Sequence, residues 1–308
     1  MHRSGRLLLL ILSTVSAAPL TAQMPFYTDN ADVTDQGTLH FEIYNEYDGL
    51  QSAQYPDLRQ NTANFKVNYG LPHRLELDFD IPYLTIYRAP GSENTAGNGD
   101  ADMGIKWNFR KAAHPLSYPA LSASLYIEFP TGDVKQNLGS GLTDYWLNLI
   151  AEEPFSDKTR LTANFGFVFA GNTSTGVLGI QTIRGNVYTG GLSLLHDFNP
   201  RVTLGAELYG AIADKEGLGK DQLQGLAGGQ FQLNPRMAFT FAVLGGSHIA
   251  SPAIGGQVGF EVDFPLARHS SATSSTSENQ MKQPLRNGDH HGMQARSPEE
   301  CSPLFAAR

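Results

Sequence analysis

An unbroken alternation of apolar and charged residues runs from Arg74 to Ile81, in the order Arg-Leu-Glu-Leu-Asp-Phe-Asp-Ile. Side chains on a β-strand point alternately to opposite faces, so this segment has one apolar face and one charged face. Similar segments of about 9 to 13 residues recur down the chain, a length that suits a tilted strand crossing a bilayer. The pattern predicts an all-β fold, an antiparallel up-and-down transmembrane β-barrel.

About twelve strands are predicted within residues 37–264, which form the barrel domain. They lie near residues 38–48, 61–70, 73–87, 100–110, 119–129, 142–152, 159–170, 186–197, 201–213, 220–233, 236–247 and 253–264. Shorter turns follow the even-numbered strands, and mostly longer, polar, glycine-rich loops follow the odd-numbered ones. Bacterial barrels have short periplasmic turns and longer extracellular loops, so both ends of the barrel domain are expected in the periplasm.

Two positions interrupt the alternation. Pro82 removes a donor from the hydrogen-bond ladder, so a bulge or an early strand end is expected there. The segment from Val187 to Leu195 shows no clean alternation, because Gly190 and Gly191 occupy its middle. No face is therefore assigned in that strand.

The apolar faces of the other strands are expected to contact lipid. They carry, among others, Leu39, Phe41, Ile43, Phe65, Val67, Tyr69, Met103, Ile105, Trp107, Leu125, Leu147, Leu149, Phe165, Phe167, Leu204, Leu208, Phe241, Val258 and Phe260. Aromatic residues gather near the strand ends, as they do in the interfacial girdles of membrane barrels.

The opposite faces are polar and mainly acidic, and they are expected to line the lumen. The charged lumen-lining candidates are Glu42, Lys66, Arg74, Glu76, Asp78, Asp80, Asp102, Lys106, Arg110, Glu128, Asp144, Glu207 and Glu261. Rings of Asp and Glu favour cations in pores, so this wall predicts a modest cation preference that weakens when Asp78 and Asp80 become Asn. A barrel of ~8 strands fills its interior and one of ~16 leaves a channel, so a conducting lumen and a packed one both remain open.

Residues 1–22 are interpreted as a cleaved secretory signal peptide. A positively charged start precedes an apolar run from Leu7 to Leu12, and small residues up to Ala22 provide the cleavage site. Together with the barrel pattern, this signal predicts the outer membrane of a Gram-negative-type bacterium.

Two segments flank the predicted barrel. Residues 23–36 form an N-terminal lead-in, for which entry into the lumen as a short plug is one arrangement. Residues 265–308 are rich in Ser, Gln, Asn, Pro, His and Arg without periodicity, and are predicted to be a disordered polar tail.

Composition excludes several other classes of protein. The mean hydropathy of −0.26 argues against a bundle of membrane helices. The net charge of −8 argues against a nucleic-acid partner, because binding phosphates needs a basic surface. The single cysteine, Cys301, excludes an intramolecular disulfide and a cysteine-based zinc cluster.

No cofactor, metal or catalytic activity is predicted. Residues 98–102, Asn-Gly-Asp-Ala-Asp, resemble an acidic calcium loop but lack its closing Glu, and turn chemistry explains them without a metal. Ser247 and His248 are adjacent, and neighbours on a strand point to opposite faces. No Gly-x-Ser-x-Gly motif is present. A lipolytic barrel is therefore the least favoured interpretation.

Three local patterns resemble those of a known bacterial family. Residues 25–30, Pro-Phe-Tyr-Thr-Asp-Asn, resemble its Pro-Phe-x-Thr-Asp-Asp opening. Residues 97–107, Gly-Asn-Gly-Asp-Ala-Asp-Met-Gly-Ile-Lys-Trp, resemble its Gly-Asp strand start followed by Gly-x-Lys and an aromatic residue. Residues 129–133, Phe-Pro-Thr-Gly-Asp, with 138–141, Leu-Gly-Ser-Gly, resemble its Pro-Thr-Gly-Asp loop ahead of a glycine-rich strand start.

In this order and spacing, the patterns resemble the outer-membrane barrel family named for the meta-pathway of phenol degradation, from about Pro25 to Phe264. The resemblance implies a single barrel in the outer membrane and passage of small organic compounds, aromatic ones included. It implies no agreed catalytic or binding residue, and the polar tail falls outside it.

The sequence favours a channel or transporter for passive passage of small organic solutes. The alternative is a non-conducting barrel that stabilises the envelope or binds a partner through its loops, and an outer-membrane hydrolase ranks third. The expected partners are outer-membrane lipid, the barrel-assembly machinery through the last strand ending at Phe264, and a small-molecule solute, with no nucleic acid.

Overall fold

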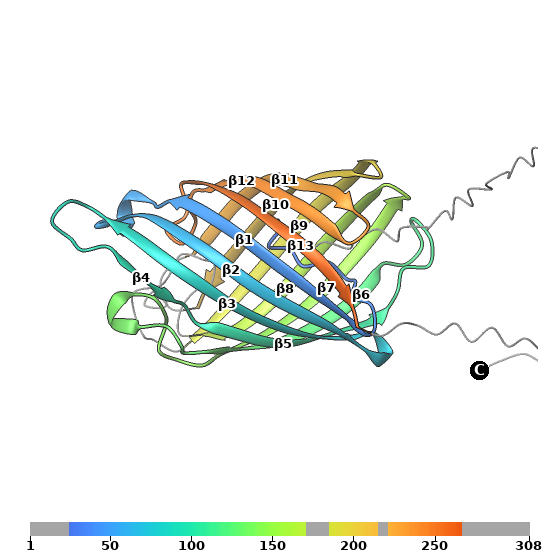
Figure 1. The fold of residues 1–308 in the computed structure, drawn as a ribbon, viewed down its shortest axis with the longest axis horizontal. Helices are drawn as coiled ribbons and strands as arrows, with labels where there is room; N and C mark the ends of the chain where they lie inside the picture. The colour runs from blue at the N-terminus through green and yellow to red at the C-terminus, as the bar shows by residue number, and fades with distance from the viewer. Residues whose placement is uncertain (1–24, 171–184, 215–220, 267–308) are drawn as a thin grey trace, which may run out of the picture. The chain divides into compact units, whose positions relative to one another are not determined.

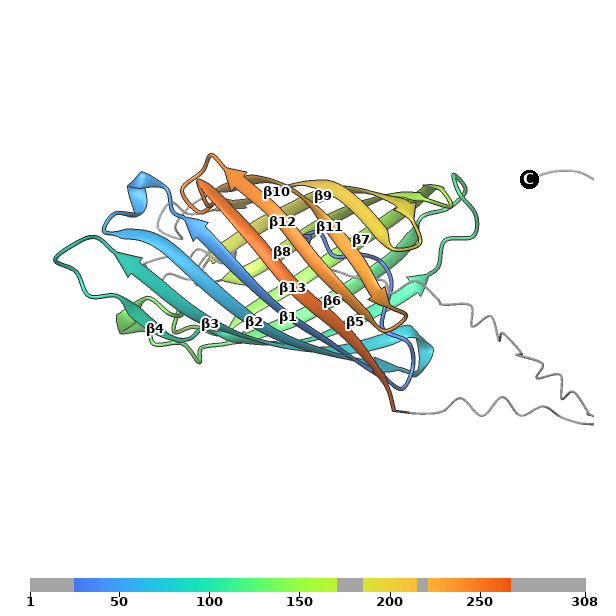
Figure 2. The ribbon, with the colours of Figure 1, turned by 45° about the horizontal axis from the view of Figure 1, so that its top comes forward.

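The computed structural model describes residues 25–170, 185–214 and 221–266. Within these residues, one antiparallel sheet closes on itself, because β1 (Thr38–Gly49) pairs with β2 (Asp57–Leu71) on one side and with β13 (Ile254–Pro265) on the other. Figure 1 shows the barrel from the side, and Figure 2 shows β13 beside β1 at the closing seam. Closure leaves no free sheet edge, as a barrel in lipid requires.

Twelve tilted strands form the wall, since the short β4 only extends the ladder of β3. The remaining strands are β3 (Leu75–Arg88), β4 (Thr95–Asn98), β5 (Ala101–Arg110), β6 (Ala120–Phe129), β7 (Asp144–Ser156), β8 (Thr159–Ala170), β9 (Gly185–Asn199), β10 (Val202–Ala213), β11 (Gln222–Asn234) and β12 (Met237–Gly246). Three single turns of 3₁₀ helix, η1 (Ser52–Gln54), η2 (Pro72–Arg74) and η3 (Val134–Gln136), lie in the connections.

The predicted fold class is confirmed, and each predicted strand has a counterpart in the structure. The largest boundary differences are in β2, which begins at Asp57 rather than near residue 61, and in β7, which ends at Ser156 rather than near residue 152. The short β4 lies in a segment that was predicted to be loop. The predicted signal peptide and nearly all of the predicted tail lie outside the described residues.

The expectation for Pro82 was wrong. β3 continues through Pro82 to Arg88, and its register with β2 has no shift at that position. The interruption is on the other side, where the pairing with β5 ends at Asp80 and the pairing with β4 begins at Tyr83. The missing donor therefore falls where β3 changes partner, and the Pro82 carbonyl still accepts from the Gly99 amide at 2.8 Å.

β9, whose faces could not be assigned from sequence, alternates regularly. Val187, Thr189, Ser193 and Leu195 are buried inward, whereas Tyr188, Leu192 and Leu194 are exposed outward. Gly191 occupies an inward position between them. The apparent loss of pattern arose because this inward position carries no side chain and because apolar residues occur on both faces.

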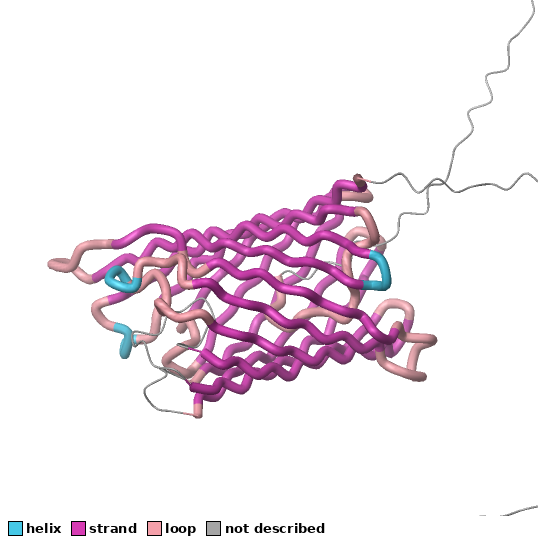
Figure 3. The backbone as a smooth tube through the Cα atoms, turned by 90° about the horizontal axis from the view of Figure 1, so that it is seen from below, coloured by secondary structure: helices cyan, strands magenta, loops and turns pink. Residues whose placement is uncertain are grey.

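The connections differ in length between the two ends of the barrel (Figure 3). The turns at residues 157–158, 200–201 and 235–236 lie at one end, called the turn end here, where β1 also begins and β13 finishes. The loops at residues 89–100 and 130–143 lie at the other, called the loop end. This is the parity that the sequence predicted, and it is typical of bacterial outer-membrane barrels.

The outer surface of the barrel is apolar. Large hydrophobic side chains stay exposed along most strands, including Leu149, 53% exposed, and Phe165, 58% exposed. A soluble protein rarely leaves so much contiguous apolar surface in water, so this belt is a lipid-contact surface. Among the described residues, no helix has the length and apolar character to cross a membrane.

The belt makes a depth-dependent prediction. Leu149→Arg, in the middle of β7, should lower the free energy of unfolding by about 2–4 kcal/mol, because a charge at the bilayer midplane is poorly solvated. Tyr145→Arg, on the same face nearer the loop end, should cost about 0–1 kcal/mol. Urea titration of the lipid-reconstituted protein, read by the different gel mobility of folded and boiled barrel, measures both. Equal costs for the two variants would argue against this placement in the bilayer.

Candidate functional site

The structure places most of the predicted charged candidates on the inner wall. Eleven point inward from the strands and are buried or half-buried: Glu42, Lys66, Glu76, Asp78, Asp80, Asp102, Lys106, Glu128, Asp144, Glu207 and Glu261. Two lie elsewhere. Arg74 belongs to η2 and Arg110 ends β5, and both are exposed at the turn end. The alternation of apolar and charged residues does not predict the η2 turn, in which His73 and Arg74 have positive φ angles.

The wall is divided by charge. The carboxylates and lysines face the lumen from β13 and from β1 to β7. Across β8 to β12, Glu207 is the one buried charged residue in the part of the chain that the structure describes. A half-buried ion pair of Arg160 and Asp197 lies at the turn end, and the other inward side chains of these strands are mostly neutral or apolar. The lumen therefore has a charged side and a nearly neutral side.

An apolar patch lies on the neutral side at the loop end. Val168 of β8, Val187 of β9 and Ala211 of β10 are buried together, with Trp146 of β7 packed against them. The Trp146 indole nitrogen is buried and has no hydrogen-bond partner among the described residues. Sequence reasoning did not single out Trp146, although its parity with Asp144 and Asn148 puts it on the inner face.

The segment of residues 25–36, called the N-terminal segment here, enters the lumen from the turn end (Figure 1). The Tyr27 hydroxyl donates to the Glu46 carboxylate of β1 at 2.7 Å. The backbone amides of Tyr27 and Thr28 donate to the Glu207 carboxylate of β10 at 3.1 and 2.6 Å. This part of the segment is thus held between two distant strands.

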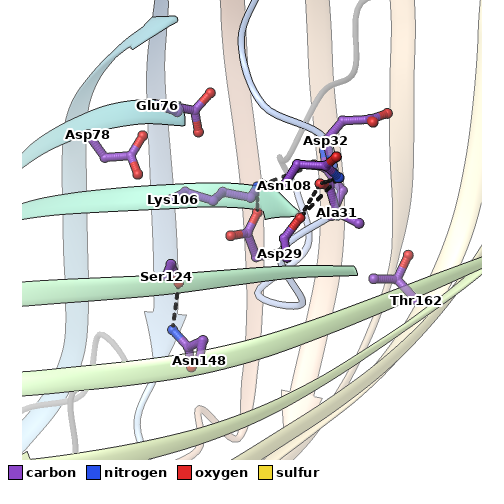
Figure 4. A network of polar contacts seen from close by, with 12 residues as sticks. Asp29, Ala31, Asp32, Glu76, Asp78, Lys106, Asn108, Ser124, Asn148 and Thr162 are labelled. Carbon is purple, nitrogen blue, oxygen red and sulfur yellow. Dashed lines mark hydrogen bonds and ion pairs between the residues drawn. The ribbon is translucent and has the colours of Figure 1, made fainter. Parts of the chain in front are cut away.

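The next residues bind the charged side of the wall, as Figure 4 shows. Lys106 of β5 is 0% exposed, and its Nζ atom lies 2.8 Å from the Asp29 carboxylate. The Asn108 amide donates to the Ala31 carbonyl at 2.6 Å, and the Ser122 hydroxyl of β6 donates to the same carbonyl. Burial raises the pKa of the Asp29 carboxyl, and the Lys106 charge acts in the opposite direction.

Apolar contacts anchor the beginning of the segment. Phe26 is buried in a cluster with Leu195, Leu226 and Leu244, which face inward from β9, β11 and β12. Burying a phenylalanine side chain contributes about 1.5–3 kcal/mol relative to leaving it in water. The segment therefore crosses from the neutral side, at Phe26, to the charged side, at Asp29.

One inward glycine makes room for this crossing. A Cβ atom added to Gly191 of β9 would overlap the Thr28 hydroxyl, so the close approach of the segment needs the absence of a side chain there. The neighbouring Gly190 points outward, and a Cβ added there would meet only the Asn164 carbonyl oxygen at an ordinary 3.8 Å. The lumen wall is shaped to hold the N-terminal segment.

At the loop end, hydrogen bonds and apolar contacts hold one loop against the wall. The Asp100 carboxylate accepts from the Gly132 amide at 2.8 Å and from the Ser140 amide at 2.7 Å. Leu138 is buried against Leu84 and Ile86, which face inward from β3. The loop of residues 130–143 is thereby folded against the inner wall of the barrel.

The structure gives little support for a catalytic site or a metal site. The Ser247 hydroxyl lies 3.1 Å from Nδ1 of His248, in the exposed loop after β12 rather than on a strand. The expectation that these side chains point apart was therefore wrong, but no described hydrogen bond joins His248 to a carboxylate. No group of three or more His, Cys, Asp or Glu among the described residues is arranged to hold a metal ion.

The closed sheet, the apolar belt and the polar lumen define an outer-membrane-type β-barrel. The chain belongs to the family described as "Putative MetA-pathway of phenol degradation", whose model matches residues 74–262, more than half of the chain. The resemblance predicted from the sequence motifs is confirmed. No curated protein matches the sequence significantly.

Solved structures share the fold at low sequence identity. An outer membrane channel from Pseudomonas putida F1 has a TM-score of 0.61 and 14% identity, with coverage of 76% of this chain and 98% of that one. The KdgM porin has a TM-score of 0.50 and 9% identity, with coverage of 73% and 99%. The NanC porin has the same score and identity, with coverage of 73% and 98%.

The glycine pair of β9 tests the seating of the N-terminal segment. Gly191→Leu should displace the segment from the wall and raise the single-channel conductance of the full chain in planar bilayers. Gly190→Leu, one residue away but facing lipid, is the matched control and should conduct like the wild type. If the two variants gave the same conductance, the segment would not be what narrows the lumen.

Proposed function

We propose that this protein is an outer-membrane channel for passive passage of small organic solutes, aromatic compounds included. The observation that carries the proposal is the apolar patch of Trp146, Val168, Val187 and Ala211 inside the lumen at the loop end. An apolar patch on the inner wall offers contact to the apolar part of an organic solute, which a lumen that conducted only hydrated ions would not need.

The patch suits an aromatic solute with a hydroxyl group. Val168 and Val187 are each 1% exposed, so they pack behind Trp146, and the half-buried indole ring is the part of the patch that a solute ring can contact. The indole N–H is buried and has no hydrogen-bond partner among the described residues, so a phenolic oxygen would supply the missing acceptor. Farther along the neutral side, Leu226 and Leu244 are buried against Phe26 of the N-terminal segment. The family description, which refers to phenol degradation, agrees with this class of solute.

A non-conducting barrel is the second candidate, favoured by the N-terminal segment in the lumen. The contacts of Tyr27, Thr28 and Asp29 reach β1, β10 and β5, so the segment narrows the lumen where it crosses. A lumen narrowed by this segment suits passage of small molecules better than passage of large ones.

Proteoliposomes separate these candidates. Vesicles that contain the full chain should take up phenol-sized neutral solutes faster than empty vesicles, and Trp146→Ala should slow that uptake because it removes both the ring surface and the N–H donor. Tyr145→Ala, the adjacent lipid-facing substitution, is the control and should leave uptake unchanged. Uptake no faster than in empty vesicles would favour the non-conducting barrel.

A further inference from the structure

A single row of charged side chains crosses seven neighbouring strands of the lumen wall. Each residue is the direct register partner of the next, in the order Glu261, Glu42, Lys66, Asp80, Asp102, Glu128 and Asp144. Six of the seven are carboxylates. Neighbouring strands are about 4.8 Å apart, so the six steps extend roughly 29 Å along the wall. This set is called the carboxylate row.

The carboxylate row climbs from one end of the barrel to the other. Glu42 lies near the beginning of β1, which starts at the turn end, whereas Asp144 is the first residue of β7, which starts at the loop end. Register runs across the strands, and the strands are tilted to the barrel axis (Figure 1), so the row winds obliquely up the wall.

The negative charge of the row exceeds the positive charge that contacts it. Lys66 Nζ lies 3.9 Å from Glu42 Oε1, and His40 Nε2 lies 3.3 Å from the same oxygen. Glu261 is 1% exposed, and neither of its carboxylate oxygens has a hydrogen-bond partner in the part of the chain that the structure describes. A buried carboxylate without a partner is costly, and a proton or a bound cation at this position would relieve that cost.

The spacing suits a loosely held cation rather than a chelated metal. Neighbours in a row allow a cation to be shared between two carboxylates at a time, whereas Ca²⁺ takes 6–8 oxygen ligands. In the described residues no cluster of three potential ligands is arranged for a metal, which agrees with pairwise sharing. Several weak sites in succession are what conduction requires, since each ion must both bind and leave.

We propose that the carboxylate row is a path for small monovalent cations such as K⁺, Na⁺ and ammonium, on the charged side of the lumen. The path is separate from the apolar patch, which lies on the neutral side. The inference rests on the channel function proposed above, but not on its aromatic solutes.

Asp78 provides a matched control outside the row. It lies on the same inward face of β3 as Asp80, but its register partners are Asn68 and Gly104. Its Oδ2 atom accepts a hydrogen bond from the Tyr126 hydroxyl at 2.8 Å. Asp78→Asn removes the same charge from the same strand and leaves every residue of the row in place, although Asp78 also acts on the Lys66 charge.

Reversal potentials of the full chain in planar bilayers, under a KCl gradient, test the proposal. The wild type should prefer K⁺ over Cl⁻, and Asp80→Asn should lower the permeability ratio about fourfold, the effect of losing one unit charge ~5 Å from a cation in water. Glu261→Gln should lower it as well, Lys66→Gln should raise it, and Asp78→Asn should lower it less than Asp80→Asn does. The gel mobility of unboiled protein verifies that each variant is folded.

The outcomes separate this inference from the proposed function. Equal loss of selectivity in Asp78→Asn and Asp80→Asn would overturn the row as the path, as would a wild type without cation preference that still takes up phenol. Cation current that depends on Asp80 and Glu261, in a protein that does not take up phenol, would support the row and contradict the proposed aromatic solutes.

Discussion

The closing seam between β1 and β13 is the constraint on which the rest of the structure depends. Every backbone donor and acceptor at membrane depth needs a partner within the protein, so an open sheet edge is excluded there. Pairing from Thr38 with Pro265 to Gly49 with Ile254 removes the last free edge. The same pairing brings Glu42 and Glu261 together, so the seam also fixes where the carboxylate row begins.

Most of the fold was predictable because two simple sequence patterns describe a barrel in lipid. Alternation along each strand distinguishes the lumen from the lipid face, and loop length distinguishes one end from the other. These patterns located twelve strands and eleven inward charged residues. They did not predict that Arg74 lies in the η2 turn rather than on the strand, although its guanidinium still donates to Asn108 of β5 at 3.5 Å.

The candidate site was less predictable than the wall around it. The N-terminal segment has no periodicity. The residues that bind it, such as Lys106 and Glu207, lie on strands that are far apart in the sequence. In the sequence, Gly191 interrupts the alternation of β9. The reason is not visible there, because Thr28, which occupies the space of the missing side chain, is distant in the chain. The inward position of Trp146 could have been predicted, because Trp146 lies two residues after Asp144 on the same strand and therefore shares its face.

The motifs that resembled the family have a common structural role. Asp100 from the first Gly-Asp motif binds the backbone of Gly132 and Ser140 from the Pro-Thr-Gly-Asp and Leu-Gly-Ser-Gly motifs. Residues 25–30 occupy the lumen and contact Lys106 through Asp29. Three patterns that each look like turn chemistry are therefore partners of one another across the barrel interior.

The seating of the N-terminal segment has a consequence for how the protein is made. Glu207 and Lys106, which both bind the segment, come from strands that are brought face to face only when the sheet has rolled up. The N-terminal segment, which is synthesised before the barrel domain, is therefore among the last parts to find its partners. Until then Lys106 must remain hydrated, because a buried ammonium group without Asp29 would oppose closure. The segment thus links completion of the sheet to burial of the Lys106 ammonium group.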